Sequence, residues 1–179
     1  MELKSITVTR NVMREFLCDK VIPAISELWP DDGRGKPIFI QQDNARTHVL
    51  PDDPAFLAAV KESGRDIRLL QQPPNSPDMN ILDLCFFRSI QALALESAPN
   101  TLKELILSVE RAFEAYQAKI LAKASITLQI VLKEVMKEEE GNGYNIKHMG
   151  KDVILKEGPL PKALPCDGEL YQRTLELIA

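Results

Sequence analysis

A proline-rich stretch in the middle of the chain, residues 72–83, constrains the fold more than any other part of the sequence. Pro73, Pro74 and Pro77 fix φ and disfavour helix in the residue before each. The polar side chains around them can bond nearby backbone N–H groups, which favours the start of a helix. From Met79 onward, apolar residues recur at steps of three and four. The pattern therefore predicts a helix over 80–97 with Asp83 near its beginning.

A second landmark lies upstream, where a short apolar run over residues 37–42 ends in a polar turn. A run this short suits a buried strand of a parallel sheet better than a helix. Residues 52–63 predict a helix and residues 66–71 a second strand. Strand, helix and strand form a βαβ unit, so we expect parallel strands with a right-handed crossover. Asp43 then sits at the carboxyl end of the first strand, where open α/β sheets bind ligands.

Helices are also predicted on both sides of these landmarks. Residues 11–29 read as a helix that Pro23 breaks or kinks. Its apolar face is formed by four residues, Val12, Phe16, Ile22 and Ile25. Residues 117–140 predict a long helix, residues 144–168 an extended tail, and residues 169–178 a last short helix.

A capping pattern marks one further helix. Thr101 is followed three residues later by Glu104, the spacing of a capping box. An apolar stripe then follows at helical spacing. We expect this stripe to lie in the core rather than in a dimer seam; its members are Leu102, Leu105, Ile106, Val109 and Phe113.

Bulk properties limit the class of protein. A chain of 179 residues can form one domain with a real core. No apolar run approaches the roughly 20 residues of a membrane span, and no signal peptide opens the sequence. Cys18, Cys85 and Cys166 are scattered, which favours a reducing, intracellular compartment over a disulfide framework or zinc site. The net charge of −4 argues against a nucleic-acid surface over the whole chain, but not against a local site.

Two aspartates are the candidate chemical groups. Two metal ions can run phosphodiester cleavage when acidic residues converge on one point, and Mg²⁺ prefers oxygen ligands. From residue types alone, a plainer interpretation is favoured: Asp43 is a turn residue, and Asp83 is a carboxylate placed favourably in a first helical turn. A third interpretation is an unrelated α/β enzyme that uses both groups for acid–base work.

The two landmarks together resemble the catalytic core of mariner-like DDE/D transposases. The resemblance rests on residues 41–48 followed by residues 73–83, with the 39 residues 44–82 between the two aspartates, a spacing similar to the plant-type branch. Residues 84–91, 144–151 and 160–161 also resemble that branch. The similarity runs from about Val8 to Pro161, and both half-motifs in order make it specific.

The resemblance implies a fold, a site and partners. The fold would be α/β, a partial RNase H-like βαβ unit followed by a helical C-terminal region. Residues 1–98 would be a truncated catalytic core, 99–140 its helical extension, and 141–179 an extended tail ending in a short helix. Asp43 and Asp83 would bind Mg²⁺ or Mn²⁺ as catalytic ligands. The partners would be transposon-end and target DNA in the nucleus, together with a second copy of the chain or a full-length transposase.

Four further residues are candidates for second-shell or DNA-contacting roles. Asn44, Arg46 and His48 follow Asp43 on the same turn, and Arg88 lies in the helix after Asp83. His48 lies near the site in the family, although packing or a backbone bond explains a turn histidine equally well. The two arginines could meet phosphates, but lone arginines are more often solvated or ion-paired. Asp78 is interpreted as a helix cap rather than a catalytic group.

The chain departs from the family in one large respect. Such transposases need a first carboxylate on an upstream strand, and Glu2, Glu15 and Asp19 do not supply it. The N-terminal helix-turn-helix region is also missing. We therefore expect a C-terminal fragment that is inactive in DNA cleavage by itself, or a non-catalytic binding protein derived from a transposase. Without the missing strand, the strand at 37–42 is expected to have a bare edge, and the chain to be marginally stable.

Overall fold

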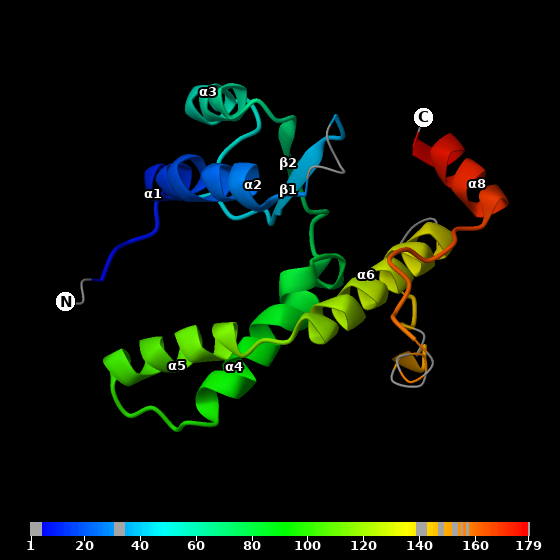
Figure 1. Ribbon diagram of the computed structural model, residues 1–179. Coiled ribbons are helices and arrows are strands. Elements are labelled where there is room, and N and C mark those ends of the chain that lie inside the picture. The colour runs from blue at the N-terminus through cyan, green and yellow to red at the C-terminus, as the bar shows by residue number, and fades with distance from the viewer. Residues whose placement is uncertain are drawn as a thin grey trace. The chain divides into compact units, whose positions relative to one another are not determined.

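The computed structural model describes residues 5–30, 35–138, 143–146, 149–151, 154, 156 and 158–178 (Figure 1). The chain forms two compact units, Met1–Ser76 and Pro77–Ala179. The first contains helices and a small sheet, and the described part of the second is helical. The mixed α/β class predicted from the sequence is confirmed. The predicted boundaries after residues 98 and 140 follow the family resemblance and stay predictions.

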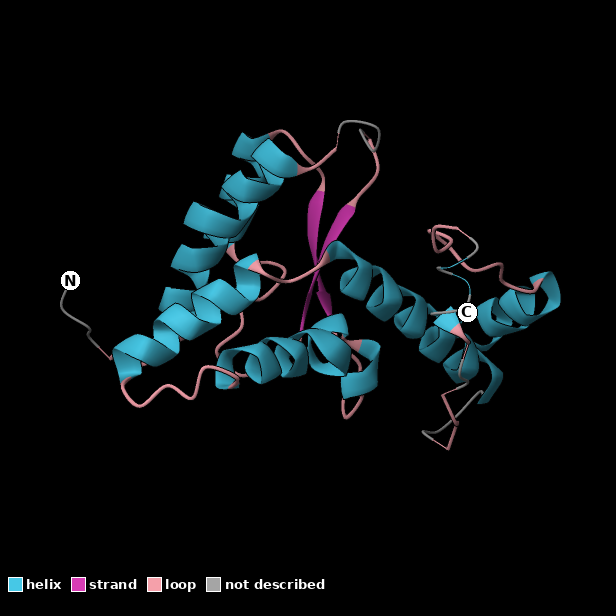
Figure 2. Ribbon diagram, turned by 60° about the horizontal axis from the view of Figure 1, so that its bottom comes forward, coloured by secondary structure: helices cyan, strands magenta, loops and turns pink. Residues whose placement is uncertain are grey.

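The sheet of the first unit consists of two parallel strands, β1 (Ile38–Gln42) and β2 (Ile67–Gln71), which lie side by side in Figure 2. Ile38 pairs with Ile67 at one end of the register and Gln42 with Gln71 at the other. The predicted parallel pairing is thus confirmed. Within the described residues, β1 has a neighbouring strand on one side only, as expected for a bare edge.

Helix α3 (Pro54–Ser63) connects the two strands and shows clear start and stop signals. The Asp53 carboxylate accepts hydrogen bonds from the backbone N–H groups of Ala55 and Phe56, so Asp53 is the N-cap. Pro54 occupies the first turn, where its missing N–H costs nothing. Gly64 ends the helix with φ +66°, a left-handed conformation that suits glycine.

The first helical segment contains a π-helical turn. Helix α1 (Arg10–Phe16) leads into a π turn (Leu17–Val21) and then into α2 (Ile22–Leu28). The Ile22 N–H donates to the Leu17 carbonyl, five residues back. Pro23 explains the irregularity, because it lacks an N–H and its ring would clash with the carbonyl four residues earlier in a regular helix. The sequence predicted this disturbance as a break or kink.

The core of the first unit lies between these helices and one face of the sheet. Its buried side chains are Leu17, Ile22, Ile38, Val49, Phe56 and Ile67. The prediction that Phe16 faces inward is wrong, since its side chain is 55% exposed. The π turn shifts the helical phase so that Leu17 and Ile22 both reach the core. The opposite face of the sheet exposes Phe39 and Leu70.

The second unit begins with irregular helical turns. A 3₁₀ turn, η3 (Pro77–Met79), precedes a π turn, η4 (Leu82–Phe86), and helix α4 (Phe87–Leu95). The Asn80 side-chain oxygen accepts from the Leu82 N–H and so helps to start the helical segment. The helix predicted for 80–97 is therefore present, although its first turns are not regular α-helix.

Helix α5 (Leu102–Glu114) begins with the predicted capping box, formed by Thr101 and Glu104. The helix packs beside α4 (Figure 1), where Ile90 and Ala94 meet Ala112. The expectation that the apolar stripe of α5 lies in the core is wrong: all five members are between 36% and 64% exposed. The small residues Ser108 and Ala112 are buried instead, because they allow α4 to approach closely.

Helices α6 (Ala118–Glu138) and α8 (Gly168–Ile178) complete the described secondary structure, and the short terminal helix is as predicted. The tail between them is not fully extended: residues 151, 154 and 156 are helical, and the Ile154 N–H donates to the Gly150 carbonyl. The prolines that suggested an extended tail lie beyond this turn. In the described part of the chain, no helix has both the length and the apolarity needed to cross a membrane.

Candidate functional site

Asp43 lies directly after β1, at the carboxyl end of the parallel sheet, as predicted. Its Oδ1 atom accepts the backbone N–H of Ala45 at 2.8 Å, which closes a local turn. The same Oδ1 atom lies 2.8 Å from Nε2 of His48. The Asp43 side chain is 55% exposed, so its carboxylate is both oriented by the protein and accessible to a ligand.

His48 is held from both sides of its ring. Its Nδ1 atom lies 3.1 Å from Oε1 of the buried Gln42, while Nε2 faces Asp43. The Gln42 amide nitrogen donates to the Val49 carbonyl at 3.0 Å, which fixes Oε1 as the atom that faces the ring. Both ring nitrogens therefore meet acceptors. These two contacts fix the orientation of the ring at the end of β1.

The turn that carries His48 is supported by Arg10, which the sequence did not indicate, and by Asn44, which was a predicted site residue. Arg10 of α1 donates from Nη2 to the Arg46 carbonyl at 2.8 Å and from Nε to the His48 carbonyl at 3.1 Å. Asn44 donates from Nδ2 to the Gln72 carbonyl at 2.8 Å, which ties the end of β1 to the end of β2. Asn44 thus acts as a positioning residue. The Arg46 side chain is exposed.

Gln72 extends the sheet where the proline-rich stretch begins. Its N–H donates to the Gln42 carbonyl at 2.8 Å, and its side-chain nitrogen donates to the Ser76 carbonyl at 2.7 Å. Its Oε1 atom is buried and meets no donor from the residues that the structure describes. This orphaned oxygen can take a hydrogen bond from a water molecule. Asn75 completes the bend with φ 56°.

Asp83 lies in the η4 turn of the second unit and is exposed. Its Oδ2 atom accepts the Asn80 side-chain N–H at 3.0 Å. Arg88 is exposed on α4. The structure thus gathers four predicted site residues, Asp43, Asn44, Arg46 and His48, on one turn of the first unit, whereas Asp83 and Arg88 belong to the second unit.

The prediction for Asp78 needs correction. Asn80, rather than Asp78, accepts a backbone N–H at this helix start, while the Asp78 carboxylate accepts a hydrogen bond from the Tyr144 hydroxyl. Burial and, after it, the adjacent Asp78 carboxylate together raise the pKa of Tyr144 to about 12. Sixty-six residues separate the two partners, so no local pattern could have indicated this contact. It fastens the segment around Tyr144 to the beginning of the second unit.

The carboxylate oxygens of the two aspartates are the type of ligand that a hard divalent cation prefers. Two carboxylates supply fewer ligands than such a cation needs. Each carboxylate offers oxygen ligands, and an imidazole bonded to Asp43 would orient that ligand. No group of three or more His, Cys, Asp or Glu residues suitable for a metal ion is found in the described ranges. Asp43 and Asp83 belong to different units, and each offers carboxylate oxygens to a cation within its own unit.

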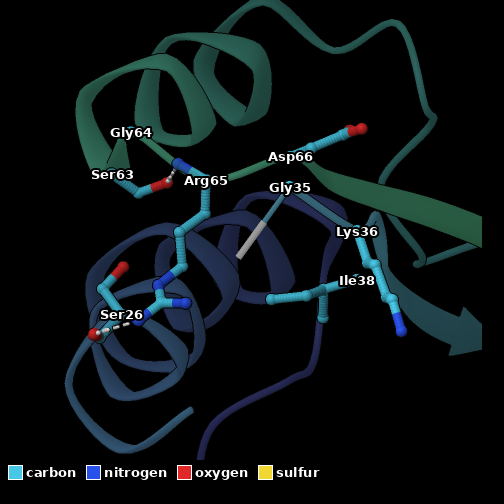
Figure 3. Close-up of a pocket in the computed structure, with 8 residues that line it drawn as sticks. All are labelled: Ser26, Gly35, Lys36, Ile38, Ser63, Gly64, Arg65 and Asp66. Atoms are coloured by element: carbon cyan, nitrogen blue, oxygen red, sulfur yellow. Dashed lines mark hydrogen bonds between the residues drawn. The ribbon is translucent and has the colours of Figure 1, made fainter. Parts of the chain in front are cut away.

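A cavity of about 530 Å³ lies at the opposite end of the sheet, near Lys36, Ile38 and Asp66 (Figure 3). Arg65 reaches across it and donates to the carbonyls of Ser26 and Trp29 at the C-terminus of α2. Helix C-termini carry partial negative charge, so this guanidinium acts as an internal cap. Helix capping thus explains the position of Arg65, and the cavity lies away from the carboxyl end where Asp43 is found.

Comparisons with protein-family models, with curated proteins and with solved structures found no match to this chain.

Proposed function

We propose that these 179 residues are the C-terminal part of the catalytic region of a mariner-like DDE/D transposase, and that they do not cut DNA by themselves. Asp43 and Asp83 would be two of its metal-binding carboxylates. The proposal is supported by the two motifs in their order and spacing, and by a parallel strand pair that ends at Asp43. DNA as partner and the nucleus as location come with the resemblance and belong to the same proposal.

The main support for the proposal is the set of contacts that the Asp43 carboxylate makes. A plain turn residue needs only the bond from the Ala45 N–H. Asp43 additionally meets His48, which is itself fixed by the buried Gln42. The Ala45 N–H and the His48 ring both meet Oδ1, and Oδ2 accepts no hydrogen bond from the described residues. An exposed carboxylate held by an imidazole, which is itself held by a buried amide, is typical of a metal ligand whose neighbours fix its orientation.

Each residue has a distinct role in the proposed site. Asp43 and Asp83 would hold the cations, His48 would orient Asp43, and Asn44 would keep the turn against the end of β2. Bound Mg²⁺ or Mn²⁺ would supply activation of the attacking oxygen and stabilisation of the leaving oxygen at a phosphodiester. Two carboxylates without the third are expected to bind the cation weakly and to leave DNA uncut.

The test is metal binding and DNA nicking by the full chain. Mn²⁺ binding, measured by the loss of the free-ion electron paramagnetic resonance signal, should weaken in Asp43→Asn and in Asp83→Asn. Asp66→Asn is the matched control, because Asp66 is an exposed carboxylate paired with Arg68 at the other end of β2. Supercoiled DNA should remain intact with the chain alone. Metal binding that is indifferent to both substitutions would contradict the proposal.

A second candidate function is a non-catalytic binding module derived from a transposase. The exposed apolar stripe of α5 favours it, since such surfaces mark interaction sites. Complex formation that is unaffected by Asp83→Asn would support this function. Turnover of a small substrate without added metal would instead support acid–base chemistry at the two aspartates.

A further inference from the structure

The exposed face of α5 has the pattern of a helix-pairing seam. Leu102, Ile106, Val109 and Phe113 follow one another at steps of four, three and four residues. This spacing places a continuous apolar row along one side of the helix, as in a coiled-coil seam. Each of the four side chains is at least 36% exposed. The row is therefore an uncovered surface of the second unit, and we call it the α5 seam.

The α5 seam is separate from the surface that packs on α4. The buried residues Ser108 and Ala112 mark the side of α5 that meets α4. At 100° per residue, the seam lies roughly 110° around the helix from that side. Phe113 meets Phe86, the last residue of η4, through an edge contact with the ring centres 6.2 Å apart. A second helix can therefore approach the seam without displacing α4.

The charges beside the seam indicate which helix can approach. Lys103 and Glu110 are exposed, lie seven residues apart, and so flank the seam on the same side. Neither forms an ion pair in the described part of the chain. In an antiparallel pair of α5 helices, Lys103 of each copy lies opposite Glu110 of the other, while Leu102 meets Phe113 and Ile106 meets Val109. In a parallel pair in register, the Lys103 and Glu110 side chains of the two copies would lie on opposite flanks of the seam and would form no charge pairs.

We propose that the α5 seam binds the α5 seam of a second copy of this chain in an antiparallel, two-fold symmetric pair. Such an interface is self-complementary in both its apolar row and its flanking charges. The helix has 13 residues and is therefore about 20 Å long. A contact of this length is small, so we expect a weak dimer with a dissociation constant on the order of 10–100 µM.

The first test is the mass of the full chain in solution. Sedimentation velocity should show a monomer at low concentration and a dimer at high concentration. Ile106→Glu, in the seam, should abolish the dimer. Leu107→Glu is the matched control, because Leu107 is 41% exposed on the same helix but lies off the seam. Circular dichroism should confirm that both variants keep their helix content.

A charge exchange tests the antiparallel register. K103E and E110K each create two like-charge pairs across the interface, so each should weaken self-association by about tenfold at low salt. The K103E/E110K double variant restores both pairs and should recover dimerisation. The two single variants should also bind each other, since a mixed pair has two opposite-charge contacts. Arg111→Glu, on the far side of α5, is the charge-matched control.

Three results would overturn the proposal. The first is a chain that stays monomeric at every concentration, whether the α5 seam is covered by the first unit of the same chain, by another protein or by nothing. The second is a dimer that survives Ile106→Glu. The third is a dimer in which the double charge exchange fails to rescue the single variants, which would exclude the antiparallel pairing.

Discussion

Arg14 and Asp53 join helix α1 to the start of helix α3. The guanidinium Nη2 lies 2.7 Å from Oδ2 of Asp53, and Nε lies 2.9 Å from Oδ2 and 3.1 Å from Oδ1. The Asp53 side chain is only 8% exposed and also caps α3. One carboxylate therefore serves both an ion pair and a helix start, which makes it a sensitive position in the first unit.

Asp53→Ala should destabilise the first unit. It removes the cap of α3 and leaves the Arg14 guanidinium without its partner, so we expect a loss of about 1–3 kcal/mol in the free energy of unfolding. Urea unfolding followed by circular dichroism measures it. Asp52→Ala is the control, as the neighbouring carboxylate is exposed. Equal stability of Asp53→Ala and the wild type would show that the cap and the pair contribute nothing.

The same pair should make stability fall in acid. The Arg14 hydrogen bond, supported by backbone bonds from Phe56 and Ala55, holds the pKa of Asp53 below its ordinary value of 3.8. The unfolded chain then binds the proton more tightly, so this contribution is present above about pH 4 and is lost as pH falls through the lower folded value. Urea titrations from pH 6 down to about pH 2.5 should show a steeper loss in the wild type than in Asp53→Asn.

His48→Ala should loosen the turn at the end of β1. The substitution removes the donor to Asp43 and leaves Oε1 of the buried Gln42 without its ring contact, so we expect a cost of about 1 kcal/mol. It should also weaken Mn²⁺ binding if His48 orients Asp43. Arg46→Ala, an exposed position on the same turn, is the control. Unchanged unfolding and unchanged metal binding would rule out a positioning role.

Ala112→Leu should disrupt the contact between α4 and α5. Ala112 is buried with Ile90 and Ala94, so a larger side chain would have to displace these neighbours. Overpacking of this kind typically costs about 1–3 kcal/mol. Ala115→Leu, at the exposed end of the same helix, should have little effect. Thermal unfolding at low chain concentration compares the two variants without a contribution from self-association.

The isolated chain should be marginally stable. Its sheet has two strands, one face exposes Phe39 and Leu70, and β1 has a strand neighbour on one side only in the described part of the chain. Such edges favour pairing with other chains. We expect a broad thermal transition with aggregation on heating, observed by calorimetry and light scattering. A sharp, fully reversible transition would contradict this expectation.

Local signals in the sequence predicted much of the fold. The two strands, helix α3 and the capping box at Thr101 depend on neighbouring residues and are found as predicted. Turn chemistry also placed Asp43 at the end of β1. The capping interactions span only a few residues, and the parallel pairing follows from the strand–helix–strand order, so the pattern contains the information.

Longer-range relationships were not predictable in the same way. Arg10 meets the His48 turn across 38 residues, and Tyr144 meets Asp78 across 66. Which side of α5 is buried depends on which side packs against α4. That side carries the small residues Ser108 and Ala112 and not the larger apolar stripe. Helical periodicity identifies an apolar face, but it does not reveal whether another element covers that face.

The π turn at Leu17–Val21 has a consequence for changes in chain length. Ile22 follows Leu17 by five positions, yet both side chains are buried in the same core. The π turn has more residues per turn than an α-helix, so these two side chains lie on nearly the same side. In a regular helix that separation would point the two side chains in different directions. Deleting one residue between them would realign the faces but bring the Pro23 ring against a carbonyl of the preceding turn. The length of this segment and the position of its proline are therefore coupled, so neither is expected to change in a related chain without the other.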